Sequence, residues 1–462
     1  MKKMFCYMVQ LYCACLLLAC FVLFTASCRK FVTIAPPENQ VVTTTVFTDE
    51  QTATAAVTGL YSQLMTSNLL ITNGGMSLYC GLSADELYRS SPNPDIDAFA
   101  ANSLSAANLV NSGLWAKAYQ FIYHANACLE GLASSGISNT VKDQLIGEVM
   151  FTRAFCYFLL VNLYGNVPLI TTTDYRLNAI AVRKPLSDVY IQIIHDLEQA
   201  QSLLPATYIA PGRIRPNKWT ATTLLARTYL YMEDWVHAEE AATNVISSGM
   251  YNLVNNLSDV FLASSPEVIW QLLPVVSGSN TAEGASFVPS SATAKPVYVV
   301  TNLLLNAFEA GDQRKNNWIK TNTVGGQPVC YPYKYKLRSG TTKTEYNIVF
   351  RLAEIYLIRA EARAHLQKIN ESKTDIDKTR NRASLAPVIA TDESSLLMAI
   401  EKERRVELFA EWGHRWLDLK RTERATPVLS GIKAGWSPNW QWYPLAESDL
   451  QRNPFLVQNT GY

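Results

Sequence analysis

The chain has 462 residues, nearly half of them hydrophobic, and a formal net charge of +1. This length provides for two or three ordinary domains or one large one, with enough apolar side chains for a large core. The balanced charge argues against a dedicated nucleic-acid binder, which would concentrate cations against phosphate.

The first 27 residues are typical of a bacterial secretory leader that ends in a lipobox. Lys2 and Lys3 precede an apolar run up to Phe24, and the small residues Thr-Ala-Ser stand directly before Cys28. We expect a signal peptide over 1–27, with Cys28 acylated and forming the new N-terminus. An ordinary secretory signal and an uncleaved anchor of roughly 20 residues stay open as alternatives. After Cys28 we expect no apolar run long enough to cross a membrane.

The mature chain is expected to begin with a tether and to continue in helices. Residues 28–48 carry no periodicity and include Pro36 and Pro37, which predicts a lipidated tether. From Asp49 to Leu64, apolar residues fall at spacings of three and four, which predicts a helix. A loop rich in Ser, Asn, Gly, Asp and Pro follows over 73–97. Further helices are expected at 114–132, 142–164, 187–203, 217–232 and 234–248.

The sequence changes character at residue 250. Short strand-like pieces, among them EVIWQLL and the alternating CYPYKYKL, are joined by long polar loops up to residue 345. Helices are expected again at 346–368, 371–383 and 393–412. We therefore divide the mature chain into an N-terminal helical region, 49–249, and a C-terminal region, 250–462. The latter comprises variable loops at 270–345, helices at 346–421 and an irregular tail at 422–462.

A weak internal repeat runs through the helices. The pattern Ala-x-x-Tyr occurs as AFCYF from Ala154, as ARTYL from Ala226 and as AEIYL from Ala353. Small residues let paired helices approach closely, which is the packing of tetratricopeptide-like helix pairs. The alternative is an ordinary helical bundle in which Ala and Tyr recur by composition.

The densest charge lies in EKERRVELFAEWGHRWLDLKR. Glu407, Glu411, Arg415, Asp418 and Arg421 step by three or four, so we expect them on one side of a helix. Glycoside hydrolysis needs two acids, one of them kept protonated. Here each acid has an arginine one turn away, and arginine lowers a carboxyl pKa. We therefore predict a structural ion network. No GxSxG, HExxH or GxxxxGK[ST] motif occurs, so no enzyme is expected.

Four cysteines follow the leader region: Cys80, Cys128, Cys156 and Cys330. They are scattered and have no histidine at ligand spacing, so a zinc site is not expected. The sequence assigns no disulfide among them, and buried free thiols are the default interpretation.

An ordered set of segments resembles one known family. It comprises SCRKFVTIAPPENQ, LSADELY, GEVMFTRAFCYFLLVNLYGNVPLI, DLEQAQSLLP, RLAEIYLIRAEARA, ERRVELFAEWGHRWLDLKR and NPFLVQNTGY. In this order they resemble the SusD/RagB family of Bacteroidetes outer-membrane lipoproteins, from one end of the chain to the other. The resemblance implies a mainly α fold, a tetratricopeptide-like superhelix with a loop-rich ligand-binding region. It also implies a lipid-anchored protein at the cell surface that captures a glycan or an oligopeptide. The expected partner is a SusC-like TonB-dependent transporter.

Two loops offer the aromatic faces and polar groups that a sugar requires. In the family, the segment after the LSADE-like motif contributes to the ligand site. The ligand-binding candidates are Tyr79, Asp85, Tyr88, Arg89 and Asn93 in the first loop, and Phe287, Tyr298 and Trp318 in the second. For each aromatic residue, core packing is the alternative, and it is favoured for Tyr331 and Tyr333. The acidic loop at 85–97 permits a structural calcium ion, and no other cofactor is expected.

Two other functions stay open. A surface glycoside hydrolase could use acids in the loops, for example Asp85 with Glu86, although neighbouring acids rarely face one another. A helical-repeat scaffold could bind only proteins. A ligand-sized cleft with an aromatic wall would argue against the scaffold.

Overall fold

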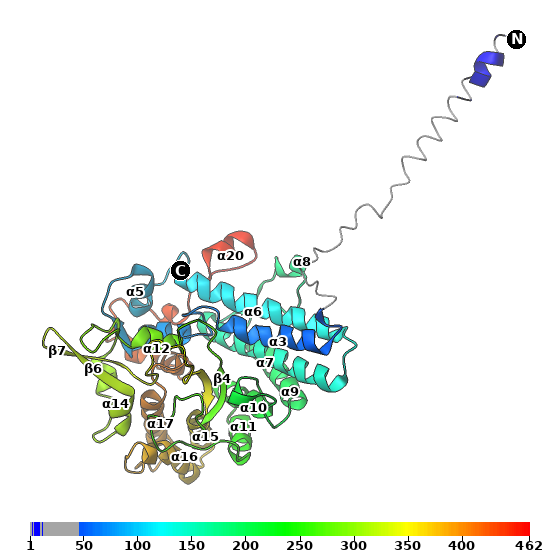
Figure 1. Ribbon diagram of the computed structural model, residues 1–462. Helices are drawn as coiled ribbons and strands as arrows, with labels where there is room; N and C mark the ends of the chain where they lie inside the picture. The colour runs from blue at the N-terminus through cyan, green and yellow to red at the C-terminus, as the bar shows by residue number, and fades with distance from the viewer. Residues whose placement is uncertain (1, 3, 10–11, 13–45) are drawn as a thin grey trace. The chain divides into compact units, whose positions relative to one another are not determined.

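The computed structural model describes residues 2, 4–9, 12 and 46–462. The predicted acylation site Cys28 and the tether up to residue 45 lie outside the described residues. Residues 47–462 form one unit by their internal contacts. Figure 1 shows that helices account for most of it, with short strands near β4 and at the β6–β7 hairpin.

Successive helices pack on one another in chain order, as the repeat predicted. Contacts join α7 to α6 and α9, α10 to α9 and α11, and α15 to α11, α16 and α17. The repeated Ala154, Ala226 and Ala353 are fully buried, which lets these helices approach closely. The long helices are α3 Glu50–Leu64, α5 Pro94–Ala101, α6 Leu109–Ala133, α7 Asn139–Tyr164, α9 Leu186–Leu203, α10 Lys218–Tyr231, α11 Trp235–Ser247, α15 Leu352–His365, α16 Ile369–Arg382, α17 Glu393–Glu407 and α18 His414–Arg421.

Shorter helical turns connect these elements. They are α4 Gly81–Ser83, α8 Tyr175–Asn178, α12 Ala282–Phe287, α13 Asn302–Leu305, α14 Gln313–Trp318, α19 Ala425–Leu429 and α20 Glu447–Arg452, with a π-helical turn at Met76–Cys80 and 3-10 turns at Pro211–Arg213 and Pro438–Gln441. Side-chain caps begin many of the helices; Asn217, for example, forms a reciprocal capping box with Thr220 at the start of α10.

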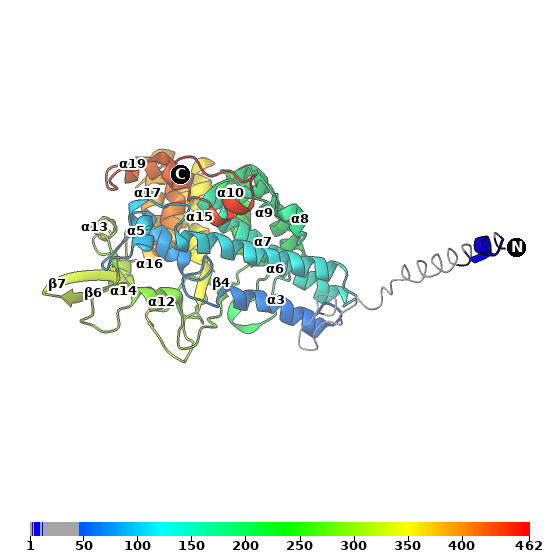
Figure 2. The ribbon, with the colours of Figure 1, turned by 90° about the horizontal axis from the view of Figure 1, so that it is seen from above.

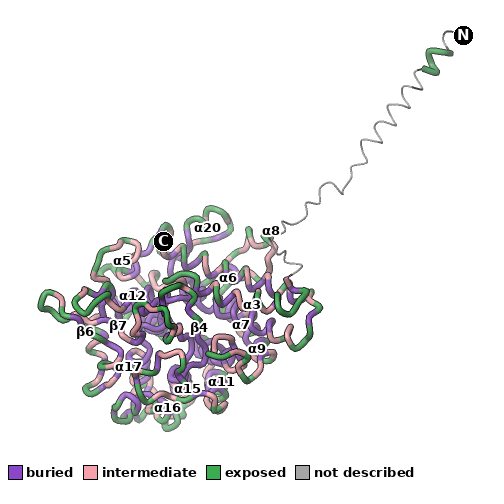
Figure 3. Tube along the Cα trace, in the orientation of Figure 1, coloured by how far each residue is buried: buried purple, intermediate pink, exposed green. Residues whose placement is uncertain are grey.

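Helix α7 forms the centre of the core. It is long and apolar enough to cross a membrane, so the expectation that no such run follows Cys28 is wrong. However, 83% of its apolar window is buried inside the protein, as a core helix requires. Figure 3 shows buried chain at the centre and exposed chain mainly at the outer turns. Figure 2, the view from above, shows α7 running beside α6.

The strands form four antiparallel pairs in the part of the chain that the structure describes. EVIWQLL contains the expected strand, but residues 347–351 were predicted as helix and form a strand instead. Their partner is β4, about 75 residues earlier, so local periodicity carried no sign of the pairing. The pairs are β1 Leu87–Arg89 with β5 Tyr298–Val300, β2 Val167–Pro168 with β3 Arg183–Lys184, β4 Val268–Leu272 with β8 Asn347–Arg351, and β6 Ile319–Val324 with β7 Gln327–Pro332.

Two further predicted elements differ from the structure. The segment 73–97 is not an open loop: it contains a π-helical turn, α4, β1 and the start of α5, and residues 73–87 are buried. The helix expected at 393–412 ends at Glu407, because Ala410, Trp412 and Gly413 all have positive φ. α18 then begins at His414, so the charged row lies on two helices rather than one.

Candidate functional site

The predicted ligand loop, here residues 76–93, is held by the C-terminal helices. Arg405 Nη2 donates to Asp85 Oδ2 at 2.6 Å, and Arg415 Nε donates to Asp85 Oδ1 at 2.9 Å. Burial alone would raise the pKa of Asp85, but the hydrogen bond and charge of Arg415, together with Arg405, hold it below its ordinary value. Asp85 is thus a buried clamp between the loop and α17–α18. Both of its carboxylate oxygens are bound by arginines, so it is not the open ligand contact that the sequence suggested.

Glu86 is a buried acid of the opposite kind. Burial raises its pKa to about 8, although its Oε2 accepts the Ala410 N–H. A raised pKa beside a lowered one is typical of acid catalysis. Both carboxylates are buried, however, and neither lines the clefts described below. The Asp85–Glu86 pair therefore has no observed route to a substrate.

Four of the predicted aromatic contacts are core residues. Tyr79 stacks on Phe99 with ring centroids 4.7 Å apart, and Phe287 packs edge-on against Tyr298. Trp318 is fully buried and donates its indole N–H to Leu257 O at 2.9 Å. All four rings are buried and offer no exposed face for stacking, so the alternative of core packing holds for each of them.

Of the two tyrosines in the second loop for which core packing was favoured, only one is buried. Tyr331 is buried, as the core-packing alternative predicted. The Tyr333 ring is partly exposed, and the Lys320 ammonium lies 4.6 Å from its centroid. That cation covers one face of the ring.

Tyr88 is the exception, because its side chain is 47% exposed on β1. The neighbouring Arg89 is half-buried, with its guanidinium carbon 6.0 Å from the Tyr298 ring centroid. Asn93 accepts the Ile96 N–H at 3.2 Å and caps α5, which gives its side chain a structural task. Ligand contact by Tyr88, Arg89 and Asn93 stays a prediction.

A cleft of about 300 Å³ opens beside Tyr88, between β1, β5 and β7. Its wall combines the tyrosine ring with the exposed Asn302 amide, Leu305, Pro328 and the half-buried Cys330. A flat ring beside an amide is the mixture that orients a sugar. Sequence reasoning missed Asn302, which lies 214 positions after Tyr88 and is brought there by the β1–β5 pairing.

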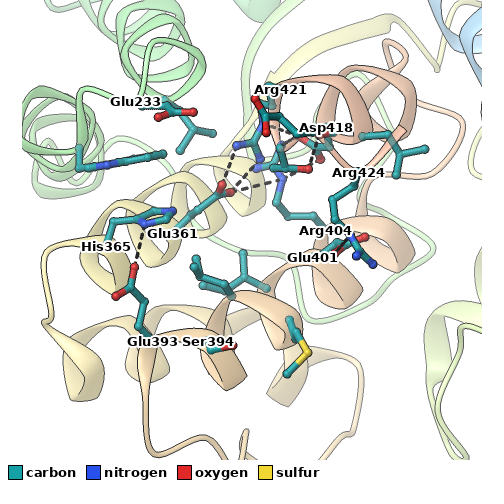
Figure 4. Close-up of a pocket in the computed structure, with 18 of the residues that line it drawn as sticks. Glu233, Glu361, His365, Glu393, Ser394, Glu401, Arg404, Asp418, Arg421 and Arg424 are labelled. Carbon is teal, nitrogen blue, oxygen red and sulfur yellow. Dashed lines mark hydrogen bonds and ion pairs between the residues drawn. The ribbon is translucent and has the colours of Figure 1, made fainter. Parts of the chain in front are cut away.

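A second cavity, of about 830 Å³, lies among α11, α15, α17 and α18. On one wall, Glu361 accepts two hydrogen bonds from Arg421, at 2.6 and 2.8 Å, and Asp418 accepts two from Arg404, at 2.8 and 3.0 Å (Figure 4). Despite burial, Arg404 and Arg421 hold the pKa of Asp418 well below its usual range. The prediction of a structural ion network is confirmed.

The opposite side of this cavity carries an aromatic pair. The rings of Trp235 and His365 stack with centroids 3.9 Å apart. His365 Nδ1 lies 3.0 Å from Glu393 Oε1 (Figure 4). Trp235 is partly buried, and much of the polar wall facing it is committed to internal pairs. The Tyr88 cleft therefore exposes more of an aromatic face.

Cysteines and metal ligands add no further site within residues 46–462. Cys80, Cys128 and Cys156 are buried free thiols, as expected, and Cys330 is a half-buried free thiol. No group of three or more His, Cys, Asp or Glu side chains in the described residues converges as a metal site would. Both oxygens of Asp85 are bound by guanidinium groups, so this residue does not fit the suggested calcium ion.

Two family models match the chain. Residues 87–230 match a family described as starch-binding and associating with the outer membrane, and residues 277–462 match the SusD family. The two matches include β1 with Tyr88, the β5 strand and the charged segment 401–421.

Similar proteins agree with the family models. The SusD-like protein P25 of Formosa agariphila is 25% identical over 97% of this chain and 98% of its own length. The starch-binding protein SusD of Bacteroides thetaiotaomicron is 23% identical over 82% of this chain and 84% of its own length. A solved laminarin binding SusD-like protein superposes with a TM-score of 0.77 at 23% identity, over 90% of this chain and 100% of that chain.

Proposed function

The chain belongs to the SusD/RagB family, and on that premise we propose that it captures a glycan at the outer surface of the cell and passes it to a TonB-dependent transporter. The family is one of surface proteins that bind carbohydrate. An oligopeptide is the alternative ligand class, because a ring beside an amide also suits a peptide.

The exposed ring of Tyr88 carries this proposal. It is the one predicted aromatic contact in the ligand-binding set that lies more than a third exposed, and it stands at a cleft with a side-chain amide on the rim. Its strand, β1, follows directly after the clamp made by Asp85 and Glu86, so the ring is held on a rigid support. A rigid aromatic platform loses little conformational entropy when a sugar ring stacks on it.

The proposed location rests on the N-terminal sequence. The small residues before Cys28 and the apolar run ahead of them support cleavage and acylation. Several acyl chains on one cysteine hold a protein firmly, since each buried methylene adds about 0.8 kcal/mol. Mass spectrometry of the mature N-terminal peptide tests the modification.

Binding without hydrolysis is the proposed role of this subunit. Asp85 is neutralised by two arginines, and Glu86 is buried against a backbone N–H. Incubation with the bound glycan should release no shorter products. Product release that Asp85→Asn abolishes would favour the hydrolase instead.

Calorimetric titration of the purified protein against laminarin, starch and a peptide panel tests the ligand. For the ligand that binds in this titration, we expect Tyr88→Ala to weaken binding by about tenfold or more, which corresponds to about 1.4 kcal/mol. Tyr88→Phe keeps the ring and should retain most of the affinity.

Trp235→Ala is the matched control, because it removes an aromatic face from the other cavity. Its affinity should equal that of the wild type. If Trp235→Ala abolished binding and Tyr88→Ala did not, the ligand would lie among the helices and the Tyr88 cleft would be excluded. If no ligand of the panel bound measurably and no transporter co-purified with the protein, the proposed function would be contradicted.

A further inference from the structure

An apolar patch protrudes from the surface at α8. Its side chains are between 48% and 77% exposed, and they come from two stretches of chain far apart in sequence. We call it the α8 patch; it consists of Tyr175, Leu177, Ile180, Val182, Phe455 and Val457.

Hydrogen bonds hold the two stretches side by side. Asn453 Nδ2 donates to Ala181 O at 2.8 Å, and Arg183 Nη1 donates to Val457 O at 2.8 Å. In Figure 1, α8 and α20, which directly precedes Asn453, lie on the same side of the folded unit. The six apolar side chains thus share one region of the surface.

The α8 patch lies beside the point where the N-terminal segment joins the folded unit. Ser135 Oγ donates to Phe47 O, and Phe47 packs against α6 at Gly131. The adjacent Glu130 accepts the Thr173 N–H at 2.8 Å, directly before α8 begins. One turn of α6 therefore supports both the start of the fold and the patch.

The Tyr88 cleft lies far from the patch. Its wall includes β7, and Figures 1 and 2 place the β6–β7 hairpin at the end of the unit opposite α8. A surface in contact with the α8 patch would leave the cleft open to the medium.

We propose that the α8 patch rests on the lipid surface of the outer membrane, as a second contact beside the Cys28 anchor of the proposed function. Side chains that protrude by half or more suit insertion among lipid headgroups, whereas a protein partner favours pockets that receive its anchors. Tyrosine at the edge is suited to the membrane–water interface. Lys184, which is exposed, flanks the patch and would face anionic headgroups. Arg176 is exposed as well, but its guanidinium pairs with Asp174 at 2.7 Å.

The length of the tether permits this contact. The segment between Cys28 and Phe47 spans at most about 68 Å when extended, because each residue adds at most roughly 3.6 Å. Covalent anchoring at Cys28 therefore keeps the patch within reach of the bilayer without fixing its orientation. The patch would supply that orientation.

An environment-sensitive fluorophore tests the contact on the full lipidated protein in vesicles of phosphatidylethanolamine and phosphatidylglycerol. In a Cys330→Ser background, Leu177→Cys and separately Val457→Cys are labelled with a nitrobenzoxadiazole dye. We expect a blue shift and brighter emission at both positions when the protein is on vesicles, because the dye enters a less polar medium.

Ile389→Cys is the matched control, since Ile389 is 96% exposed and lies between α16 and α17, outside the patch. Its dye should stay in water. Unshifted emission at 177 and 457 on protein that floats with the vesicles would overturn the lipid contact and leave the proposed function intact. A shift only after a transporter is added would also overturn it, in favour of a protein partner. Protein that is unacylated and does not float would contradict the anchor itself.

Discussion

At the scale of single residues, buried charges in this protein are satisfied by several partners at once. Glu407 accepts from Arg314, Arg351 and Arg382, and these arginines hold its pKa far below the ordinary value despite complete burial. Removing one member of such a buried group typically costs about 3–5 kcal/mol, because the remaining charge loses its compensation. Glu86 lacks this compensation: its Oε1 has no partner and burial raises its pKa to about 8.

Glu86 should therefore make stability depend on pH. Its folded pKa of about 8 lies above the ordinary 4.5, with Asp85 raising it further and Arg415 and Lys334 opposing. The folded state holds the extra proton, so this contribution is complete below about pH 4.5 and is lost as the pH rises through about 8. Each pH unit in that window is worth up to about 1.4 kcal/mol. We expect Glu86→Gln to gain stability relative to the wild type as the pH rises.

Urea unfolding at about pH 5 and about pH 8.5 measures this difference. Glu309→Gln is the control, because a hydrogen bond from Arg380 is the main cause that lowers the pKa of Glu309 to about 2. Glu309 is ionised at both pH values, so its variant should show a constant offset. A constant offset for Glu86→Gln as well would show that Glu86 is ionised in the folded protein.

At the scale of elements, the break between α17 and α18 positions the ligand loop. Trp412 donates its backbone N–H to Ser77 Oγ at 3.0 Å and its indole N–H to Ile348 O at 2.7 Å. Gly413, at φ 74°, then turns the chain into α18, whose Arg415 binds Asp85. A continuous helix over 393–421 would place these groups elsewhere.

Gly413→Ala should destabilise the protein markedly. A methyl group there would lie 2.7 Å from Cys80 Cβ, and the left-handed conformation alone costs roughly 1–2 kcal/mol for a residue with a Cβ. We expect a loss of about 2 kcal/mol or more in the free energy of unfolding, measured by urea titration. Gly431→Ala is the control, because its added methyl meets no atom within 4 Å. Equal stability of the two variants would contradict the role given to this turn.

At the scale of the whole molecule, residues from early and late segments of the chain form ion pairs and hydrogen bonds with one another. Arg227 on α10 binds Glu354 on α15 at 2.6 Å, and both are buried. Asn459, close to the C-terminus, donates to Tyr164 O at 2.9 Å and to Tyr443 O at 2.8 Å. Residues 47–462 accordingly form one unit by contacts, and the boundary at 249/250 stays a prediction about sequence character.

The described unit should unfold in one cooperative transition. Calorimetry should give equal calorimetric and van't Hoff enthalpies, since the two regions share the core around α7 and α15. A fragment of residues 47–249 should lack a cooperative transition in circular dichroism, because it leaves Arg227 without Glu354. Two separate transitions, or a folded fragment, would support two domains instead.

The sequence alone determined features whose cause lies within a few residues. Apolar spacing located α6, α7, α9, α10, α11 and α16 to within a few positions, because a helix buries one side at a fixed period. Alternating acids and arginines predicted the pairing of Asp418 with Arg404 and Arg421, whereas Glu407 and Glu411 pair with cations outside that row. The ordered motifs predicted the family. The leader is also a local sequence pattern, but Cys28 lies outside the described residues and its acylation stays a prediction.

Only the tertiary structure decided which side chains face solvent. Trp318 and Tyr88 are both aromatic residues in polar surroundings, yet one is buried beneath distant chain and the other stands at a cleft. Likewise, β8 is a strand because β4 pairs with it, and Asn302 joins the cleft because β5 pairs with β1. Exposure and strand pairing depend on what packs opposite a residue, and for these positions the opposing chain is scores to hundreds of residues away.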